Sequence, residues 1–477
     1  MINLVRNELT KIFSKKAIYI YTILVLLLMI GLSVLDKNFV ADNGYDSSYI
    51  KMLQDGLKVY NLEDEQELKM FVGDKVILDV YELSKSYDDK SPEKYYIDNY
   101  IEPLLREKYN YEYFLKDMES VKLVQSQINE RIKELDNYDW EKFIREDKTL
   151  IENEIKEVEQ LLLVDSNDKE LIRQLESLKV KLWCLNYRLD NEIPYSYENK
   201  SSLVDEYESS YLRYQEIVKD ESLLKNHTDL LEKKEVEEQY YVSLYKLENK
   251  IFDEDAELID YFVYGFNYVD GLIICAIIII VGSLISEEFN KGTIKQLLTK
   301  PYTRGKILTS KIIAGLIAVF VFIVVYDLCY ILVNCYEYDN FTTIFGNNVV
   351  YDFNIGKVRE VSILSQCLYG FVSVLPAYLI IFFLVILVGI LSTSSVAAMI
   401  SGFGLYLGGD LISLALSQKQ LALMPFFTWD LSSYMYGGLA LNEYATFTSS
   451  LIVNIVTILL LVILSYVFFK RKEVKNQ

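Results

Sequence analysis

The sequence is poor in the residues that most often carry enzyme chemistry or hold metal ions. Its single histidine is His227, which leaves almost no scope for a histidine-based metal site or general base. The chain has no G-x-x-x-x-G-K-S/T phosphate loop and therefore lacks the usual binding loop for ATP. Neither H-E-x-x-H nor G-x-S-x-G occurs. We therefore expect no catalytic residue, cofactor site or metal site in this chain.

Cysteine is also scarce, with five residues in the whole chain. Only Cys184 lies between residues 36 and 262, so a disulfide framework cannot stabilise that long polar stretch. The other cysteines lie in or beside apolar runs, where packing is the expected role. The polar stretch must therefore be stabilised by a hydrophobic core of its own, and it is long enough to build one.

Charge divides the chain into two parts of opposite sign. Residues 36–262 hold 55 acidic residues against 31 basic ones, whereas the remainder holds 13 acidic against 17 basic. This pattern indicates a strongly acidic insert within a weakly basic membrane protein.

Six apolar runs are long enough to cross a membrane, since about 20 helical residues span a hydrocarbon core of about 30 Å. They are residues 17–35, 266–285, 308–333, 370–391, 396–416 and 449–469. The sequence therefore predicts an all-α membrane protein of six transmembrane helices. A large, mainly helical extracytoplasmic domain, residues 36–262, is inserted between helices one and two. Residues 263–477 hold helices two to six.

Lysine and arginine gather before the first run, between the second and third, and after the sixth. The positive-inside rule then places both termini in the cytoplasm and the insert outside. Residues 1–16 alternate apolar and polar positions, which suits an interfacial helix, although an ordinary charged flank fits as well.

The insert carries leucine and isoleucine stripes at heptad spacing on both sides of a polar turn. Ile144, Ile151 and Ile155 precede the turn, and Leu171 and Leu178 follow it. Two stripes joined by a short turn predict an antiparallel coiled-coil hairpin near residues 141–190. Packing within the chain is the favoured role of these stripes.

Acidic residues inside apolar runs are costly and often functional. Asp327 and Asp410 are candidates for a translocation path, and Asp270 is expected at the outer interface. For Asp327, a polar contact in a substrate path and a hydrogen bond to a neighbouring helix are equally good interpretations.

Residues 286–306, between the second and third apolar runs, are basic and amphipathic. Ile294, Leu297 and Leu298 form an apolar edge at helical spacing. Thr293 is able to cap this helix, and Pro301 ends it. A surface helix near residues 287–301 is predicted, either resting on lipid alone or docking to a partner.

The ordered residues Glu288, Gly292-Thr293, Leu297-Leu298, Pro301, Arg304 and Lys311 carry a family resemblance. Their order, set between two spans, resembles the loop after the second span in membrane subunits of type-2 ABC transporters, which are mainly exporters. Tyr302-Thr303 departs mildly from the more common apolar-serine pair. The resemblance covers about 250 residues of the membrane part and does not extend to the insert.

The resemblance implies a permease subunit of an ATP-driven ABC exporter in the cell membrane of a bacterium. ATP and Mg would be held by a separate cytoplasmic ABC ATPase, and a second permease subunit would complete a homodimer or heterodimer. Membrane lipid is a further partner, and nucleic acid is not. The implied ATPase-coupling residues are Glu288, Gly292, Thr293, Ile294, Leu297, Leu298, Pro301 and Arg304.

The acidic insert favours a hydrophobic, amphipathic or cationic peptide-like cargo, such as an antimicrobial peptide, moved for export or self-immunity. Solubility alone would also account for its acidity. The alternative function is an ATPase-driven mechanotransmission or sensing module whose outer domain regulates a cell-envelope partner without transporting cargo.

Overall fold

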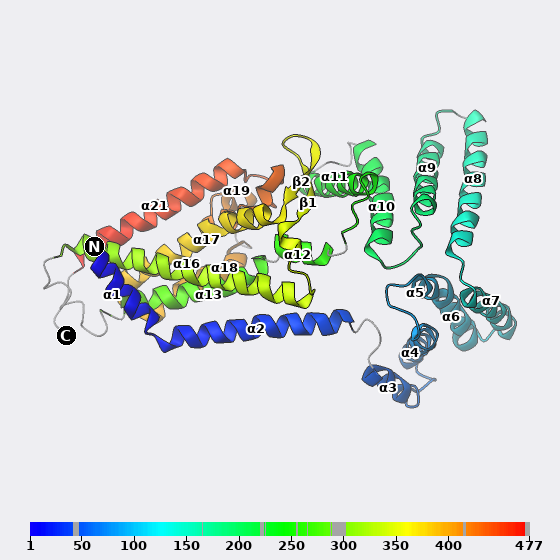
Figure 1. Ribbon diagram of the computed structural model, residues 1–477, viewed down its shortest axis with the longest axis horizontal. Coiled ribbons are helices and arrows are strands. Elements are labelled where there is room, and N and C mark those ends of the chain that lie inside the picture. Colours follow the sequence, from blue (N-terminus) through cyan, green and yellow to red (C-terminus); the bar gives the residue numbers. More distant parts are fainter. Residues whose placement is uncertain are drawn as a thin grey trace. The chain divides into compact units, whose positions relative to one another are not determined.

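The computed structural model describes residues 1–41, 47–164, 166–219, 224, 226–253, 256–264, 266–286, 288, 302–413 and 416–472. These residues are mostly helical, and they form two compact units (Figure 1). We call Met1–Leu35, Leu224–Lys234 and Asp255–Gln477 the membrane unit. We call Asp36–Leu223 and Glu235–Glu254 the acidic unit. The acidic unit is smaller than the predicted insert, residues 36–262, because it leaves out residues 224–234 and 255–262.

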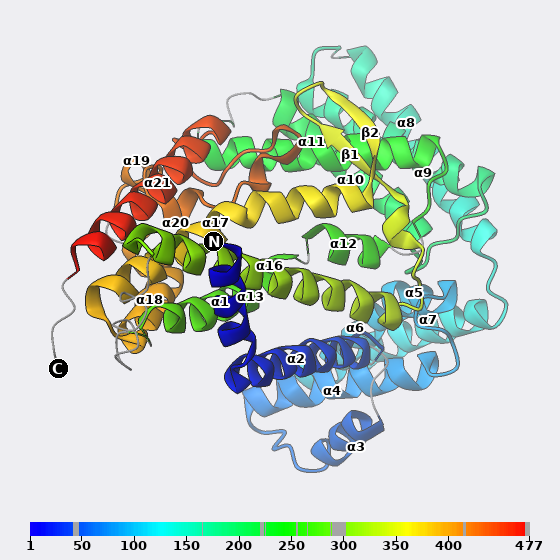
Figure 2. The same cartoon turned by 60° about the vertical axis from the view of Figure 1, so that its left-hand side comes forward.

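The membrane unit is a bundle of long apolar helices around α13 (Phe266–Leu284). Helix α13 packs against α16 (Arg304–Glu337), α17 (Ile363–Ser392) and α18 (Ser395–Ser413), and α17 also packs against α21 (Phe447–Arg471) (Figures 1 and 2). The helices approach closely where side chains are small. A Cβ atom on Gly402 of α18 would lie 2.8 Å from side-chain carbons of both Ile278 and Val385. Glycine is therefore required at this three-helix junction.

Three helices in the described part of the chain are long and apolar enough to cross a membrane, namely α16, α17 and α21. A fourth span is possible if Ile2–Phe13 and Ile18–Gly31, which are bent by 58°, act together. The expected second and fifth spans appear as the shorter apolar helices Asp270–Leu284 and Ser395–Gly409. At 1.5 Å per residue these described apolar parts reach about 22 Å, and the complete helices α13 and α18, of 19 residues each, reach about 28 Å; neither is counted among the three spans. The structure therefore supports a helical membrane protein but not the count of six spans.

The described residues are mostly helical, as predicted, and they include one small sheet in which β1 (Asn347–Asp352) and β2 (Lys357–Ser362) pair antiparallel. No structure was predicted for these residues from the sequence. Gly356 adopts a φ of +63° in the connecting turn, a conformation that glycine tolerates best. The ion pair between Arg359 and Asp352, at 2.8 Å, joins the two strands.

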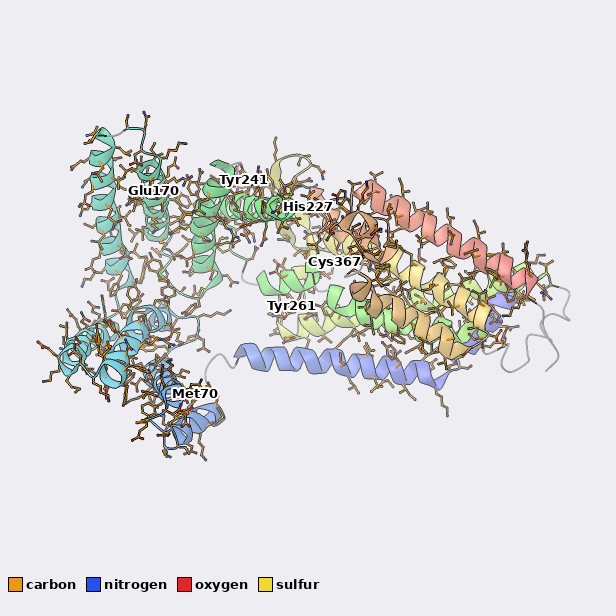
Figure 3. The ribbon with its side chains drawn as sticks, turned by 180° about the vertical axis from the view of Figure 1, so that it is seen from behind. Met70, Glu170, His227, Tyr241, Tyr261 and Cys367 are labelled. Carbon is orange, nitrogen blue, oxygen red and sulfur yellow. The ribbon has the colours of Figure 1, made fainter. Side chains whose placement is uncertain are left out.

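A smaller core lies where α16 ends and α17 begins, away from the main bundle core. Cys367 of α17 and Tyr261 of α12 (Ala256–Tyr264), both labelled in Figure 3, belong to this region. The Cys367 thiol donates to the backbone carbonyl of Phe262 at 3.3 Å, and Tyr330 donates to the carbonyl of Tyr261 at 3.4 Å. These bonds tie α12 to both long helices.

The acidic unit begins with a group of helices packed around a buried aromatic and aliphatic core. Tyr96 is buried and donates to Glu134 of α7 at 2.7 Å, which links two of these helices. In chain order the elements are α3 (Ser47–Gly56), α4 (Glu65–Ser84), α5 (Pro92–Tyr96), the π-helix η1 (Ile97–Ile101), α6 (Glu102–Tyr109), the π-helix η2 (Asn110–Leu115) and α7 (Met118–Asp136).

The predicted hairpin is present as α8 (Trp140–Val164) and α9 (Lys169–Asp190), which lie side by side (Figures 1 and 3). Asp168 caps α9 by accepting from the backbone N–H groups of Glu170 and Leu171. The unit continues with α10 (Asn199–Lys219) and with α11 (His227–Glu248), whose first residues belong to the membrane unit. Arg188 of α9 is 1% exposed and pairs with Asp205 of α10 at 2.6 Å.

We expect the hairpin to depend on the leucines between its two arms. Leu178 is 5% exposed, so Leu178→Ala should destabilise the acidic unit by about 2–5 kcal/mol through lost burial and a new cavity. Leu163, on the other arm, is 86% exposed, and Leu163→Ala should change stability by less than about 0.5 kcal/mol. Urea denaturation of the purified protein, followed by tryptophan fluorescence, compares the two variants. Equal effects would contradict the assigned packing.

Candidate functional site

The first helix, α1 (Ile2–Phe13), packs against α16 through a mixed apolar and acidic stripe. Leu4, Glu8 and Ile12 follow one another at four-residue spacing, so they share one face. All three are buried, with exposed fractions of 8%, 5% and 4%. A carboxylate in the middle of a buried stripe requires a positively charged partner, because unpaired burial of a charge is very costly.

Glu8 finds that partner in a cluster of two acids and two lysines, which we call the ion cluster: Glu8, Lys11, Glu288 and Lys311. Lys311 lies in the first turns of α16 and is fully buried. Its Nζ lies 2.8 Å from Glu8 Oε2 and 2.7 Å from Glu288 Oε2. Lys11 Nζ lies 3.1 Å from Glu8 Oε1 and 2.7 Å from Glu288 Oε1. Each carboxylate therefore bridges both ammonium groups.

The ion cluster is neutral overall, and its groups satisfy one another. The Lys311 ammonium also lies 3.5 Å from the backbone carbonyl of Leu284, at the negative end of α13. Glu288 Oε2 contacts Lys311 as an ion pair without hydrogen-bond geometry, and no other described residue donates to it. Because three of the four groups are almost completely buried, removal of one leaves a charge that water cannot reach.

A second set of contacts joins the ends of three long helices beside the ion cluster. Arg304 opens α16 and donates to the carbonyl groups of Lys470 and Lys472, at 3.0 and 2.7 Å, where α21 ends. Lys472 in turn donates to the carbonyl groups of Ile390 and Leu391, both at 2.7 Å, near the end of α17. Cations at helix C-termini satisfy carbonyl groups that have no partner within the helix.

The structure therefore places two of the predicted coupling residues at anchor points. Glu288 belongs to the ion cluster, and Arg304 holds the end of α21. The other predicted coupling residues lie outside the described residues: Gly292, Thr293, Ile294, Leu297, Leu298 and Pro301. Within the expected helix near 287–301, the structure thus describes only Glu288.

The acids of the apolar helices lie apart from the ion cluster. Asp270, at the start of the apolar part of α13, accepts a hydrogen bond from the hydroxyl of Tyr378 in α17. Asp327 is half-buried in α16, and no described residue forms a hydrogen bond or ion pair with it. The backbone of Asp410 lies in α18, and its side chain is outside the described part of the structure.

Sequence reasoning did not identify Glu8, Lys11 and Lys472 as parts of a site. Glu8 had a signal: it is an acid at the centre of an i, i+4 apolar stripe in a helix whose other charges are mostly basic. Glu288 and Lys311 stood out by their order in the sequence, but nothing in the sequence showed that they would meet Glu8. Among the described residues, no group of three or more histidine, cysteine or acidic side chains is arranged to hold a metal ion.

Long apolar helices that pack into one bundle, with basic residues at the helix ends, indicate a helical membrane protein. The chain matches the family model described as "Protein of unknown function (DUF2705)" over residues 231–475, just over half of its length, and it belongs to that family. No curated protein and no solved structure matched the chain.

Lys311→Met should destabilise the membrane unit by about 3–5 kcal/mol, because Glu8 and Glu288 would keep only Lys11 as a partner. Lys306→Met is the matched control, since Lys306 is exposed on the same helix, one turn earlier. Thermal unfolding of the purified protein in detergent measures both variants.

Adding Glu8→Gln to Lys311→Met removes the surplus carboxylate and should recover part of the lost stability. If the Lys311 and Lys306 variants unfolded at the same temperature, the ion cluster would not stabilise the bundle.

Proposed function

We propose that this chain is the permease subunit of an ATP-driven ABC exporter. The main structural support is that residues 289–301, the segment that resembles a coupling loop, are bounded on both sides by anchored residues. Glu288 precedes the segment and is held by Lys11 and Lys311. Arg304 follows it and is held by the end of α21. A load applied to this segment would therefore reach helices α1, α13, α16 and α21 together.

In this proposal the energy comes from a separate cytoplasmic ABC ATPase, which binds ATP and Mg. Closure of the ATPase pushes on the segment, and the rigid contacts at its two edges pass the displacement to the helices. A buried ion pair suits this task because it cannot slide without exposing a charge. A second permease subunit, identical or related, would enclose the path for the cargo.

The same contacts support the proposed orientation. Arg304, Lys311 and Lys472 gather at one end of the membrane unit, where α16 begins and where α17 and α21 end. The positive-inside rule assigns such an end to the cytoplasm. We therefore propose a multi-pass protein of the bacterial cell membrane with both termini cytoplasmic.

The two shorter apolar helices would complete a six-span layout. Ile277 and Ile278 of α13 are 1% and 0% exposed, so this helix lies inside the bundle rather than against lipid. A central helix of this kind need not match the thickness of the bilayer. The acidic unit would then lie outside the cell.

The proposed cargo is a hydrophobic, amphipathic or cationic peptide-like molecule, moved out of the cell for export or self-immunity. The acidic unit carries 50 acidic residues against 28 basic ones, a balance that attracts cations over long range. An antimicrobial peptide combines positive charge with apolar surface and fits this description.

The coupling claim predicts that Leu297→Asp with Leu298→Asp abolishes co-purification of the ABC ATPase, because charges replace the apolar edge. The measurement is affinity purification from the native host, with the ATPase identified by mass spectrometry and by ATP hydrolysis. Leu423→Asp with Leu441→Asp is the control, since both leucines are exposed elsewhere on the membrane unit, at 66% and 90%. Co-purification that survives the first pair would refute the coupling segment.

One observation favours the alternative, a mechanotransmission or sensing module. Helix α11 is continuous, yet its residues through Lys234 belong to the membrane unit and those from Glu235 belong to the acidic unit. Such a helix is able to carry a movement from one unit to the other without cargo. His227 and Lys234 fix its first turns to the membrane unit, with hydrogen bonds to the carbonyl groups of Ala440 and Gly437.

Reconstitution of the permease with its ATPase in liposomes separates the two functions. An exporter should show ATPase activity that rises with a cationic peptide, together with measurable movement of that peptide across the membrane. A sensing module should hydrolyse ATP without moving the peptide, and this result would favour the alternative.

A further inference from the structure

A cavity of about 290 Å³ lies within the acidic unit. Helix α8 contributes Asp147 and Glu154, α9 contributes Lys181, and α10 contributes Glu208. Its volume is at the lower end of the range for small-ligand sites, so it has room for one or two side chains of a larger ligand.

The polar part of the cavity has an excess of negative charge, with three carboxylates and one ammonium group. Burial raises the pKa of the Asp147 carboxyl, and the neighbouring Glu146 adds to this shift. Burial likewise raises the pKa of Glu208, although Lys181 opposes the shift. Neither carboxylate forms a hydrogen bond or ion pair with another residue in the described part of the chain. The fold thus holds two partly desolvated charges without a partner, which is unfavourable.

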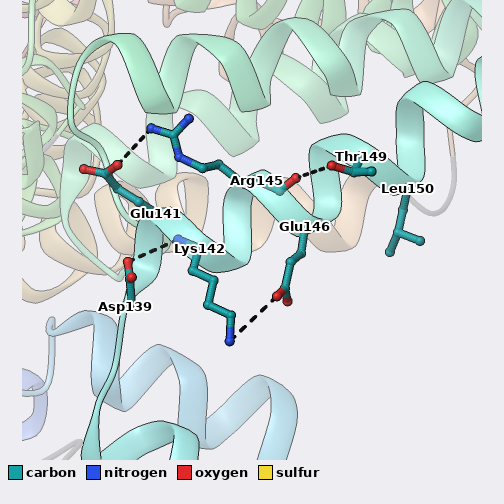
Figure 4. Close-up of a pocket in the computed structure, with 7 residues that line it drawn as sticks. All are labelled: Asp139, Glu141, Lys142, Arg145, Glu146, Thr149 and Leu150. Carbon is teal, nitrogen blue, oxygen red and sulfur yellow. Dashed lines mark hydrogen bonds and ion pairs between the residues drawn. The ribbon is translucent and has the colours of Figure 1, made fainter.

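The neighbouring surface of α8 is built differently. An open hollow there, of about 790 Å³, is also lined by charged residues, but these residues satisfy one another (Figure 4). Arg145 pairs with Glu141 at 3.0 Å, and Lys142 pairs with Glu146 at 3.8 Å (Figure 4). Glu141 and Glu146 are thus each paired with a lysine or arginine one turn away, as is Glu152 with Lys148 at 3.9 Å. Asp147, on the same helix, forms no ion pair with a described residue.

The other wall of the cavity is apolar and aromatic. It consists of Leu150, Ile151, Leu185 and Tyr195. The guanidinium group of Arg188 lies 4.4 Å from the centre of the Tyr195 ring, which helps to fix the orientation of that ring. Apolar and aromatic side chains opposite unpaired carboxylates match a ligand that is both apolar and positively charged.

We propose that this cavity is a binding site for a cationic, amphipathic peptide, whose lysine or arginine side chain lies between Asp147 and Glu208. An adjacent apolar side chain of the peptide packs on Ile151 and Leu185, and Tyr195 closes the wall. This inference rests on the proposed function, because it assigns the cargo of the exporter a first contact in the acidic unit. It also explains why the two carboxylates have no partner in the described part of the chain.

The test uses the full-length protein in nanodiscs of phosphatidylcholine and a fluorescent synthetic peptide of leucine and lysine. Fluorescence anisotropy measures its affinity in the absence of ATP. Asp147→Asn with Glu208→Gln should weaken binding about tenfold or more. The same peptide with acetylated lysines should bind the wild-type protein as weakly as the native peptide binds this variant.

The matched control is Glu141→Gln with Glu146→Gln, which changes the net charge by the same amount on the neighbouring surface. It should weaken binding by less than about twofold, as expected for exposed charges. The Asp147 and Glu208 variant should also melt at or above the wild-type temperature, because it removes unpaired charges, and this measurement verifies its folding.

Equal loss of affinity in both variant pairs would mean attraction to the general charge of the unit and would overturn the site. Unchanged binding by the Asp147 and Glu208 variant would overturn it as well. The binding assay contains no ATPase, so it is independent of the co-purification experiment. Lost peptide binding together with intact ATPase co-purification rejects only this inference. Peptide binding to the wild-type protein, combined with a failure of any ABC ATPase to co-purify with it, would support the site and reject the proposed permease.

Discussion

The bundle of apolar helices depends on neutralising charges that its folding removes from water. Lys311 is fully buried, and Glu8 and Glu288 are nearly so, which is tolerable only while the ion cluster stays complete. Glu8 and Lys311 are separated by 303 positions, so the cluster brings the first helix of the chain against the start of α16. The cluster holds α1, the start of α16 and Glu288, four residues beyond the end of α13, at one point. It therefore sets the arrangement of the helix ends around it.

This arrangement anchors both edges of the segment between Glu288 and Arg304. Its two edges are held by different kinds of contact, one a buried ion cluster and the other hydrogen bonds to the carbonyl groups that end α21. Both resist displacement, the first because charge would be exposed and the second because helix-end carbonyl groups would lose their donor. A partner that binds this segment would act on several helices at once, as an exporter and a sensing module both require.

The acidic unit differs at one place, where two partly buried carboxylates have no partner among the described residues. Most of its charges are exposed or paired within a helical turn, and its buried Arg188 is held by Ser201 and Asp205. Asp147 and Glu208 instead remain partly buried with no partner in the described part of the chain. Local instability that the rest of the fold tolerates is a common feature of binding sites, since a ligand supplies the missing partner.

The sequence by itself determined the helical character, the apolar bundle and the α8–α9 hairpin, because hydrophobic periodicity and run length are local properties. It also singled out Glu288, Arg304 and Lys311 by their order. It did not predict the β1–β2 sheet, whose two short strands lie between the long helices α16 and α17. Only the tertiary structure joined Glu8 and Lys11 to Glu288 and Lys311, and Lys472 to the end of α17. The packing of the helices decides which distant charges pair. A local pattern of residues does not predict which helix ends will meet.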